Sequence, residues 1–270
     1  MPFADHCEPL LESPGDFQKF AGWLHDECDR HHWKYVEIRP LSSPDQLQSR
    51  LPEGGEYAFH SLDIRAELAQ IFSRFHKTSV QQMIRKAEKA GLVCESGRSP
   101  EMVEAFYGLL LKTRRRHQIF PQPRQWFKNL FDCLGDNAEV RVARKDGVPI
   151  ASILVLRHQA SLVYKYGCSD ERFHNLGGIQ LLLWKLIEQS KPSGAAELDF
   201  GRSDLDNDGL IKFKDRFGAT RQSLTYLRYP KKENSATAAG WGERAARRLF
   251  SIMPDTISPV AGSILYRHIG

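Results

Sequence analysis

The order of hydrophobic patterns after Gly91 constrains the fold of this 270-residue chain more than any other feature. A strand pattern comes first, then two amphipathic helices, and then three strand patterns in close succession, which predict an antiparallel meander. A helix, a strand, a helix and a last strand follow. The successive patterns start near Leu92, Ser99, Trp126, Ala138, Val148, Leu162, Gly177, Glu197, Leu210 and Ser223. This order predicts a mixed α/β domain built around a sheet.

The residues before Gly91 predict a smaller group of elements. A helical rhythm covers residues 15–32, and strand patterns cover Tyr35–Ile38 and Tyr57–Leu62, with a polar loop rich in proline and glycine between them. Residues Leu68–Ala90 predict one long helix, for which Gly91 supplies a C-terminal cap.

Composition indicates a globular protein of a reducing compartment. The chain is 41% apolar and 26% charged, which excludes disorder, collagen and coiled coil. Its 5 cysteines form no CxxC pair, and Cys28 with His31 lacks the second ligand pair that a zinc site needs, so we expect free thiols in a cytoplasmic protein. No apolar run approaches the ~20 residues that a membrane span needs.

The net charge of +5 is unevenly distributed along the chain. Residues 1–70 hold 6 Lys and Arg against 13 Asp and Glu, whereas residues 71–128 hold 12 against 4. A basic block such as the second, which includes Arg114-Arg115-Arg116, can attract the phosphates of a nucleic acid. Solvated helix faces produce the same count, so the charge alone leaves both interpretations open.

Five sequence phrases resemble one known group of enzymes. They are IRKAEKAGL at Ile84–Leu92, YKYGCSD at Tyr164–Asp170, LGGIQLLLWKLI at Leu176–Ile187, LDFGRSD at Leu198–Asp204 and GLIKFKDRFGA at Gly209–Ala219. Together with the element order, these phrases resemble the Fem-type (FemAB-like) aminoacyltransferases, which form peptidoglycan bridges. Enzymes of that family contain two domains of the GNAT (acyl-CoA N-acyltransferase) fold.

The resemblance implies an α/β, double-GNAT arrangement whose first domain is truncated at its N-terminus. The opening MPFADHCEPL resembles a segment that relatives carry inside their first domain. We therefore expect a partial first domain over residues 1–83, a complete acyltransferase domain over residues 84–230, and a linker with a basic amphipathic tail over residues 231–270. A first domain that is simply reduced is the alternative.

The GNAT fold also implies where a donor binds. The N–H groups at one helix N-terminus hold the donor phosphates, and the resemblance places that helix start at Gly177-Gly178, preceded by Arg172 and Asn175. Asn175 stands where the family's phosphate loop, R/Q-x-x-G-x-G/A, has its first glycine. The loss of this glycine favours aminoacyl-tRNA over acetyl-CoA as the donor. A plain turn at a helix start explains the two glycines equally well.

The strongest candidate for catalysis is the pair Phe213-Lys214. In the Fem-type family the corresponding pair lies where donor and acceptor meet, and its lysine stabilises negative charge on the reacting ester. An ammonium group beside a developing oxyanion in a water-poor cleft contributes about 3–4 kcal/mol. The alternative is a lysine that faces solvent on a helix.

Two tyrosines on one strand are candidates for acceptor binding and proton transfer. Strand alternation puts Tyr164 and Tyr166 on one face and Lys165 on the other. If the tyrosines face the cleft, Tyr166 is a catalytic proton donor, while Tyr164 and Lys165 bind the acceptor. If they face the core, they are packing residues.

The next strand ends in further polar candidates. Arg202 and Ser203 would bind the acceptor, and Asp204 would take the proton from its ammonium group. Structural pairing of Arg202 with Asp199 or Asp204 is the alternative. His117 and His174 are additional candidates for a general base.

Asp204 also opens a segment that fits the start of an EF-hand loop. The aspartates at 204, 206 and 208 have the right spacing, but the twelfth position is Asp215 rather than Glu, and a strand precedes the loop. We therefore expect no metal. Instead, we expect these acids to cap the helix that starts near Gly209.

The resemblance implies a transferase that forms an amide on an amine of a cell-envelope precursor, either peptidoglycan or polysaccharide. It implies no bound cofactor, aminoacyl-tRNA as donor, tRNA as a partner, and no DNA. The tail, where Trp241 and Leu249 oppose Arg244 and Arg248, either contacts the inner face of the plasma membrane or packs on the main domain. Two alternatives stay open: an acetyl-CoA-dependent N-acetyltransferase acting on a sugar amine or another small amine, and a non-catalytic binding module.

Overall fold

The computed structural model describes residues 4–13, 15–41 and 53–229. Its helices and strands are α1 (Asp16–Arg30), β1 (Val36–Ile38), β2 (Glu53–Asp63), α3 (Leu68–Arg74), α4 (Gln82–Lys89), β3 (Val93–Gly97), α5 (Pro100–Arg116), α6 (Arg124–Leu134), β4 (Ala138–Lys145), β5 (Val148–His158), β6 (Ser161–Ser169), α7 (Gly178–Ser190), β7 (Glu197–Asp204), α8 (Asp208–Arg216) and β8 (Thr220–Tyr229). From β3 to β8 this is the predicted order, which is confirmed. The predicted linker and tail, residues 231–270, lie outside the described residues.

Eight strands form one sheet in the order β1-β8-β2-β7-β6-β5-β4-β3. The neighbours from β3 to β6 are antiparallel, which confirms the predicted meander, whereas β6 and β7 are parallel. Asp146 and Gly147 connect β4 to β5 with φ angles of 50° and 79°. Two positive φ angles in a two-residue loop are typical of a type I′ turn, which is why Asp-Gly is favoured there.

The chain forms two compact units, each discontinuous in the sequence. The first holds the described parts of Met1–His60, Gly201–Phe213 and Thr220–Ala236, and the second holds Ser61–Phe200 and Lys214–Ala219. The domain boundaries predicted after residues 83 and 230 stay predictions.

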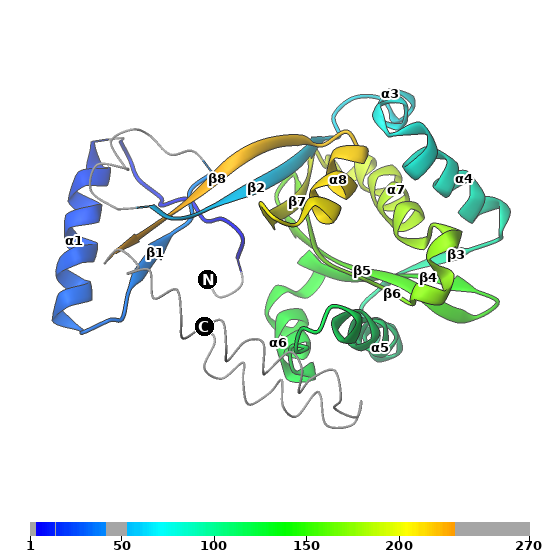
Figure 1. Ribbon diagram of the computed structural model, residues 1–270, viewed down its shortest axis with the longest axis horizontal. Coiled ribbons are helices and arrows are strands. Elements are labelled where there is room, and N and C mark those ends of the chain that lie inside the picture. Colours follow the sequence, from blue (N-terminus) through cyan, green and yellow to red (C-terminus); the bar gives the residue numbers. More distant parts are fainter. Residues whose placement is uncertain (1–3, 14, 42–52, 230–270) are drawn as a thin grey trace. The chain divides into compact units, whose positions relative to one another are not determined.

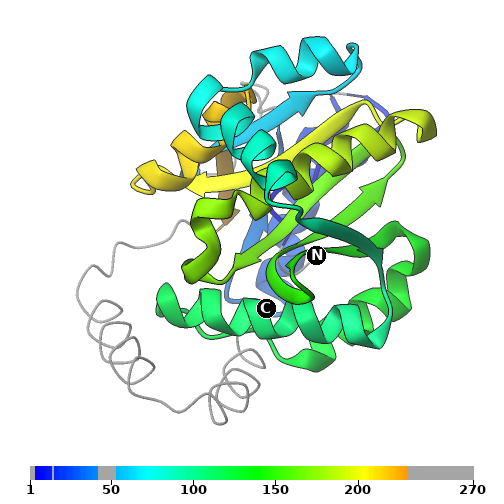
Figure 2. The same cartoon turned by 90° about the vertical axis from the view of Figure 1, so that its right-hand side faces the viewer.

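Helices cover both faces of the sheet within the second unit. Figures 1 and 2 show α4 and α7 on one face and α5 and α6 on the other. The Oγ of Ser99 caps α5 by accepting a hydrogen bond from the Met102 N–H at 3.4 Å, as the Ser-Pro sequence predicts. Phe106 and Phe127 bury the inner faces of α5 and α6 in one cluster with residues of β4, β5 and β6. Burial of side chains of this size contributes about 1.5–3 kcal/mol each.

The prediction of one long helix over Leu68–Ala90 is wrong. Phe75 adopts an extended conformation after α3, and a π-helical turn (Lys77–Gln81) then leads into α4. His76 stabilises the restart because its Nδ1 accepts hydrogen bonds from Ser79. The break lets Phe75 pack edge-on against Trp184 and Phe217. Tertiary burial of one aromatic ring therefore outweighs the local helical pattern.

The first unit has a separate core. Phe17, Ala21 and Leu24 of α1 pack with Ile38 of β1 and Leu227 of β8. All five cysteines of the chain are free thiols, as predicted. Among the described residues, no helix combines the length and the apolar character needed to cross a membrane.

Candidate active site

The hydrogen-bond ladder between β6 and β7 is short. It joins Ser161–Val163 to Glu197–Asp199, after which β6 continues to Ser169 with no further partner on β7 among the described residues. Parallel strands that stop pairing leave backbone groups available to a ligand, because each N–H and C=O needs a partner.

A β-bulge in β6 separates the two candidate tyrosines. Tyr166 pairs with Leu154 and Tyr164 pairs with the adjacent Val155, so Lys165 is the extra residue. Because Leu154 and Val155 point to opposite faces of the sheet, their partners do so too. The prediction that Tyr164 and Tyr166 share a face is therefore wrong.

The two tyrosines consequently have different surroundings. Tyr166 is 9% exposed and packs among Phe106 and Phe127 in the core under α5 and α6. Tyr164 instead contacts Phe200 of β7, with ring centroids 5.9 Å apart, and its hydroxyl lies over Gly167, where any side chain would collide with it. Burial raises the pKa of Tyr164, so its phenol stays protonated at neutral pH. At the opening between β6 and β7, where their pairing stops, the tyrosine beside β7 is thus Tyr164.

Lys214 is buried, which rules out the solvent-facing alternative. It lies on α8 and is 2% exposed, whereas Phe213 beside it is half-buried. One turn further on, the ring of Phe217 contacts Phe75 and Phe200, and Phe200 contacts Tyr164. Aromatic rings therefore run from the end of α8 to the opening between β6 and β7. A charge in surroundings of low polarity interacts more strongly with other charges than it does in water.

The two glycines at the start of α7 serve close packing. Gly177 has a φ of 74°, and a Cβ there would come within 2.5 Å of the Met83 carbonyl oxygen. A Cβ on Gly178 would come within 2.8 Å of the Cβ of Ala151. No side chain caps this helix, so N–H groups of its first turn have no partner within the helix. The two glycines can therefore serve close packing while the N–H groups of the same helix start bind a donor.

The segment before α7 forms a 3-10 helix (Glu171–Leu176) in place of an extended glycine loop. Its N–H groups are used internally: Phe173 donates to the Asp170 carbonyl and Gly177 donates to the His174 carbonyl. Asn175 is exposed on this segment. A segment of this kind offers fewer N–H groups to a pyrophosphate than an extended loop does.

Arg172 is held by a neighbouring carboxylate. Its Nε and Nη2 donate to the two oxygens of Asp170 at 3.0 and 2.7 Å, and Lys112 of α5 donates to the same carboxylate at 2.7 Å. These cations hold the pKa of Asp170 well below its ordinary value, mainly through the Arg172 hydrogen bonds. The guanidinium group of Arg172, the predicted donor-binding arginine, is thus held by Asp170 through Nε and Nη2, while the side chain remains 70% exposed.

Basic side chains gather around this carboxylate. Arg116 of α5 donates to the Ser169 carbonyl at 3.3 Å, and His174 lies 2.8 Å from the Ser169 hydroxyl. Burial, and then the charges of nearby arginines, lower the pKa of both His117 and His174. Both imidazoles are therefore neutral at pH 7. This group joins the end of α5 to the segment before α7 and carries an excess of positive charge.

The predicted acceptor residues of β7 lie in the first unit. The Arg202 guanidinium lies 4.0 Å from the Tyr57 ring centroid and 5.3 Å from that of Tyr226. It also pairs with Asp204 at 3.8 Å, as the alternative role of Arg202 predicts. Ser203 is 2% exposed. Burial raises the pKa of Tyr226 to about 12, although the nearby Arg202 and Arg39 guanidinium groups act in the opposite direction.

The aspartates before α8 do not supply its capping oxygen. Asn207 does so, because its Oδ1 accepts a hydrogen bond from the Leu210 N–H at 3.2 Å. Asp208 lies in the first turn, where a negative charge complements the helix dipole. The prediction that an aspartate supplies the capping oxygen of this helix is therefore wrong.

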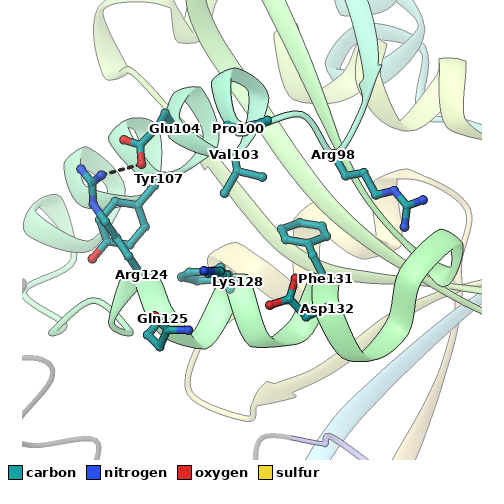
Figure 3. Close-up of a pocket in the computed structure, with 11 residues that line it drawn as sticks. Arg98, Pro100, Val103, Glu104, Tyr107, Arg124, Gln125, Lys128, Phe131 and Asp132 are labelled. Atoms are coloured by element: carbon teal, nitrogen blue, oxygen red, sulfur yellow. Dashed lines mark hydrogen bonds and ion pairs between the residues drawn. The ribbon is translucent and has the colours of Figure 1, made fainter.

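A groove between α5 and α6 is a feature that the sequence patterns missed. It has a volume of about 450 Å³, and Val103 and Phe131 point into it from the two helices (Figure 3). Arg124 pairs with Glu104 at one end, and its guanidinium lies 4.8 Å from the Tyr107 ring centroid. The periodicity of α5 and α6 predicts apolar faces, but not that the two helices leave a recess between them.

Comparison with known proteins gives the family and the fold. A family model described as an acetyltransferase (GNAT) domain matches residues 49–214. The structure is similar to FemX, with a TM-score of 0.64 and 15% identity over 78% of this chain and 76% of that one. No curated protein sequence matches.

Two further structures share the fold. One is the C-terminal domain of a putative lysylphosphatidylglycerol synthetase from Agrobacterium fabrum, with a TM-score of 0.55 and 15% identity over 86% of this chain and 77% of that one. The other is a tandem GNAT protein from the clavulanic acid biosynthesis pathway, with a TM-score of 0.51 and 15% identity over 82% and 73% of the two chains.

Proposed function

Because this chain belongs to the family of GNAT acetyltransferase domains, we propose that it is a Fem-like N-acyltransferase. It transfers an aminoacyl group from aminoacyl-tRNA to an amine of a cell-envelope precursor. The observation that carries this proposal is the burial of Lys214, which is 2% exposed, in the same unit as β6 and the part of β7 that pairs with it. Burying an ammonium group is costly, so a chain that retains one there has a use for its charge.

The reaction requires charge stabilisation and one proton relay. The acceptor nitrogen attacks the ester carbonyl, a C–N bond forms, and the carbonyl oxygen becomes an oxyanion that Lys214 stabilises. The C–O bond to the terminal ribose then breaks, and the leaving oxygen takes a proton from the phenol of Tyr164. The nitrogen gives up its extra proton, which restores the phenol. Atoms and charge balance without a cofactor.

The segment before α7 supports aminoacyl-tRNA as the donor. The 3-10 helix uses its own N–H groups, whereas the pyrophosphate of acetyl-CoA needs several of them in one loop. Exposed cations, in contrast, are well suited to phosphates that are spread along a nucleic acid backbone. Arg172 and the last turn of α5 provide such cations.

The fold neighbours support an aminoacyl group and an envelope acceptor. The name of the lysylphosphatidylglycerol synthetase describes a lipid that carries a lysyl group, and FemX shares the fold over three-quarters of its length. We propose that the present enzyme acts on the cytoplasmic side of the membrane, where charged tRNA is available.

A transfer assay with matched donors tests this proposal. Purified full-length chain is incubated with radiolabelled aminoacyl-tRNA or acetyl-CoA, together with a muramoyl pentapeptide or a glucosamine oligomer as the amine. We expect labelled amide from aminoacyl-tRNA alone, and calorimetric binding of charged tRNA but not of CoA. Transfer from acetyl-CoA would establish the acetyltransferase alternative. Binding of neither donor would favour a non-catalytic module.

A further inference from the structure

Two tryptophans on the first unit are exposed without serving its core. Trp23 on α1 is 54% exposed and Trp33, just after the helix, is 46% exposed. The core face of α1 is formed by other residues, Phe17, Ala21, Leu24 and Cys28. Exposed large aromatic side chains that do not support the fold mark interaction surfaces.

These tryptophans belong to a continuous stripe along α1, which consists of Phe20, Trp23, Glu27, His31 and Trp33. Phe20 stacks on Trp23 with centroids 6.1 Å apart, and His31 stacks on Trp33 with centroids 5.5 Å apart. Glu27 pairs with His31 at 3.1 Å and lies four residues after Trp23, on the same side of the helix. The stripe therefore consists of two stacked ring pairs on one side of α1 and its end, and Glu27 lies between them.

Each tryptophan of the stripe has one supported face. The neighbouring ring lies nearly parallel, at 27° for Phe20 on Trp23 and at 18° for His31 on Trp33. About half of each indole remains exposed. A flat ring held from one side presents its electron-rich face, which attracts C–H groups of a sugar ring and cations.

The charge around the stripe narrows the choice of partner. Residues 16–34, which carry the whole stripe, hold four acids, Asp16, Asp26, Glu27 and Asp29, against three bases, Lys19, Arg30 and Lys34. Two of these acids already have basic partners, since Asp16 pairs with Lys19 and Glu27 pairs with Arg30. A nucleic acid or an anionic lipid surface requires the opposite balance. The partner that this surface fits is neutral or cationic, with flat apolar faces that stack on indoles.

We propose that the stripe binds a glycan chain that carries free amino groups, with sugar faces on Trp23 and Trp33 and ammonium groups near the acids of α1. This inference rests on the proposed function, since it makes an amino-sugar polymer the substrate class that supplies the acceptor amine. Trp33 lies beyond the end of α1, where its N–H donates to the Cys28 carbonyl at 2.9 Å. Cys28 is five residues after Trp23, about 7–8 Å at ~1.5 Å per helical residue, so neighbouring sugars of one chain can contact both tryptophans.

Calorimetry with the full-length chain tests the glycan site without any transfer reaction. The probes are the glucosamine hexamer, its fully N-acetylated counterpart, and vesicles of phosphatidylcholine or phosphatidylglycerol. We expect saturable binding of the glucosamine hexamer, several-fold weaker binding of the acetylated form, and none of the vesicles. Replacement of both residues, Trp23→Ala with Trp33→Ala, lowers the affinity at least tenfold.

Matched variants separate a binding role from a structural one. Ile119→Ala and Val148→Ala remove exposed apolar side chains of the second unit and leave glycan affinity unchanged. Trp23→Phe with Trp33→Phe retains flat rings and restores part of the affinity. The thermal transition of each variant is measured to confirm folding.

The outcomes distinguish this inference from the proposed function. Absence of hexamer binding, equal affinity in the Trp→Ala double variant, or Trp-dependent binding to vesicles in place of glycan overturns the glycan site, even if aminoacyl transfer is observed. Conversely, Trp-dependent hexamer binding by a chain that transfers no aminoacyl group supports the glycan site and contradicts the proposed function.

Discussion

Two cations of the second unit, Lys214 and Arg172, have opposite surroundings. Lys214 is 2% exposed, on a helix that leads to a row of aromatic rings. The Arg172 side chain is 70% exposed, and two of its N–H groups are bonded to Asp170. A buried charge acts strongly on a reacting group, whereas an exposed charge is weakened by water and salt. Under the proposed function, Lys214 acts on the reacting ester and Arg172 attracts the phosphates of the donor.

Replacing the buried cation has the largest expected effect. Lys214→Met removes the charge with little change in volume, and we expect kcat for aminoacyl transfer to fall ~10³-fold, about 4 kcal/mol, because the oxyanion loses its stabilising ammonium. Lys212→Met on the same helix is the control, since Lys212 is exposed. If the Lys214→Met enzyme retained a normal kcat, the proposed chemical role of Lys214 would be contradicted.

Replacing the tyrosine at the opening has the next largest effect. Tyr164→Phe removes the proton donor while keeping the ring on Phe200, so we expect kcat to fall ~10²-fold. Tyr166→Phe, on the opposite face of β6, leaves kcat within about twofold, because its ring packs in the core. Steady-state kinetics of the two variants measures the difference, and equal losses would contradict the assignment.

Removing the carboxylate that anchors Arg172 affects stability and its pH dependence. Asp170→Asn loses charge-assisted hydrogen bonds to Arg172 and Lys112, with an expected cost of about 2 kcal/mol in the free energy of unfolding. The folded-state pKa of Asp170 is depressed, so its contribution is complete above the ordinary Asp pKa near ~3.9 and declines as the pH falls toward the folded value. Urea unfolding at a series of pH values should therefore show that the difference in the free energy of unfolding between wild type and Asp170→Asn decreases as the pH falls from neutral to acidic. A constant difference would contradict this account.

Replacing the exposed cation has the smallest effect. Arg172→Ala should weaken binding of charged tRNA a few-fold, with kcat at saturation unchanged, because one exposed phosphate contact contributes about 0.5–1 kcal/mol. The slope of log affinity against log salt concentration should decrease by about 0.7–0.9. Fluorescence anisotropy of labelled tRNA at several salt concentrations measures both. A loss of kcat as large as that of Lys214→Met would contradict the comparison.

Much of the fold was predictable because its causes are local. The Ser99-Pro100 start of α5 and the Asp146-Gly147 hairpin depend on a few adjacent residues, and the order of elements from β3 to β8 follows from hydrophobic periodicity. The break at Phe75 was not predictable, since it depends on Trp184 and Phe217, more than a hundred residues away in sequence.

For the candidate site, the sequence by itself determined which residue types are present and on which elements they lie: a lysine on α8, tyrosines on β6, and glycines at the start of α7. The tertiary structure decided what each one touches. The bulge at Lys165 depends on the register with β5, the burial of Lys214 on the packing around α8, and the anchoring of Arg172 on a carboxylate that α5 also reaches. Register, burial and ion pairing are set by neighbours distant in the chain, and a local pattern carries no record of them.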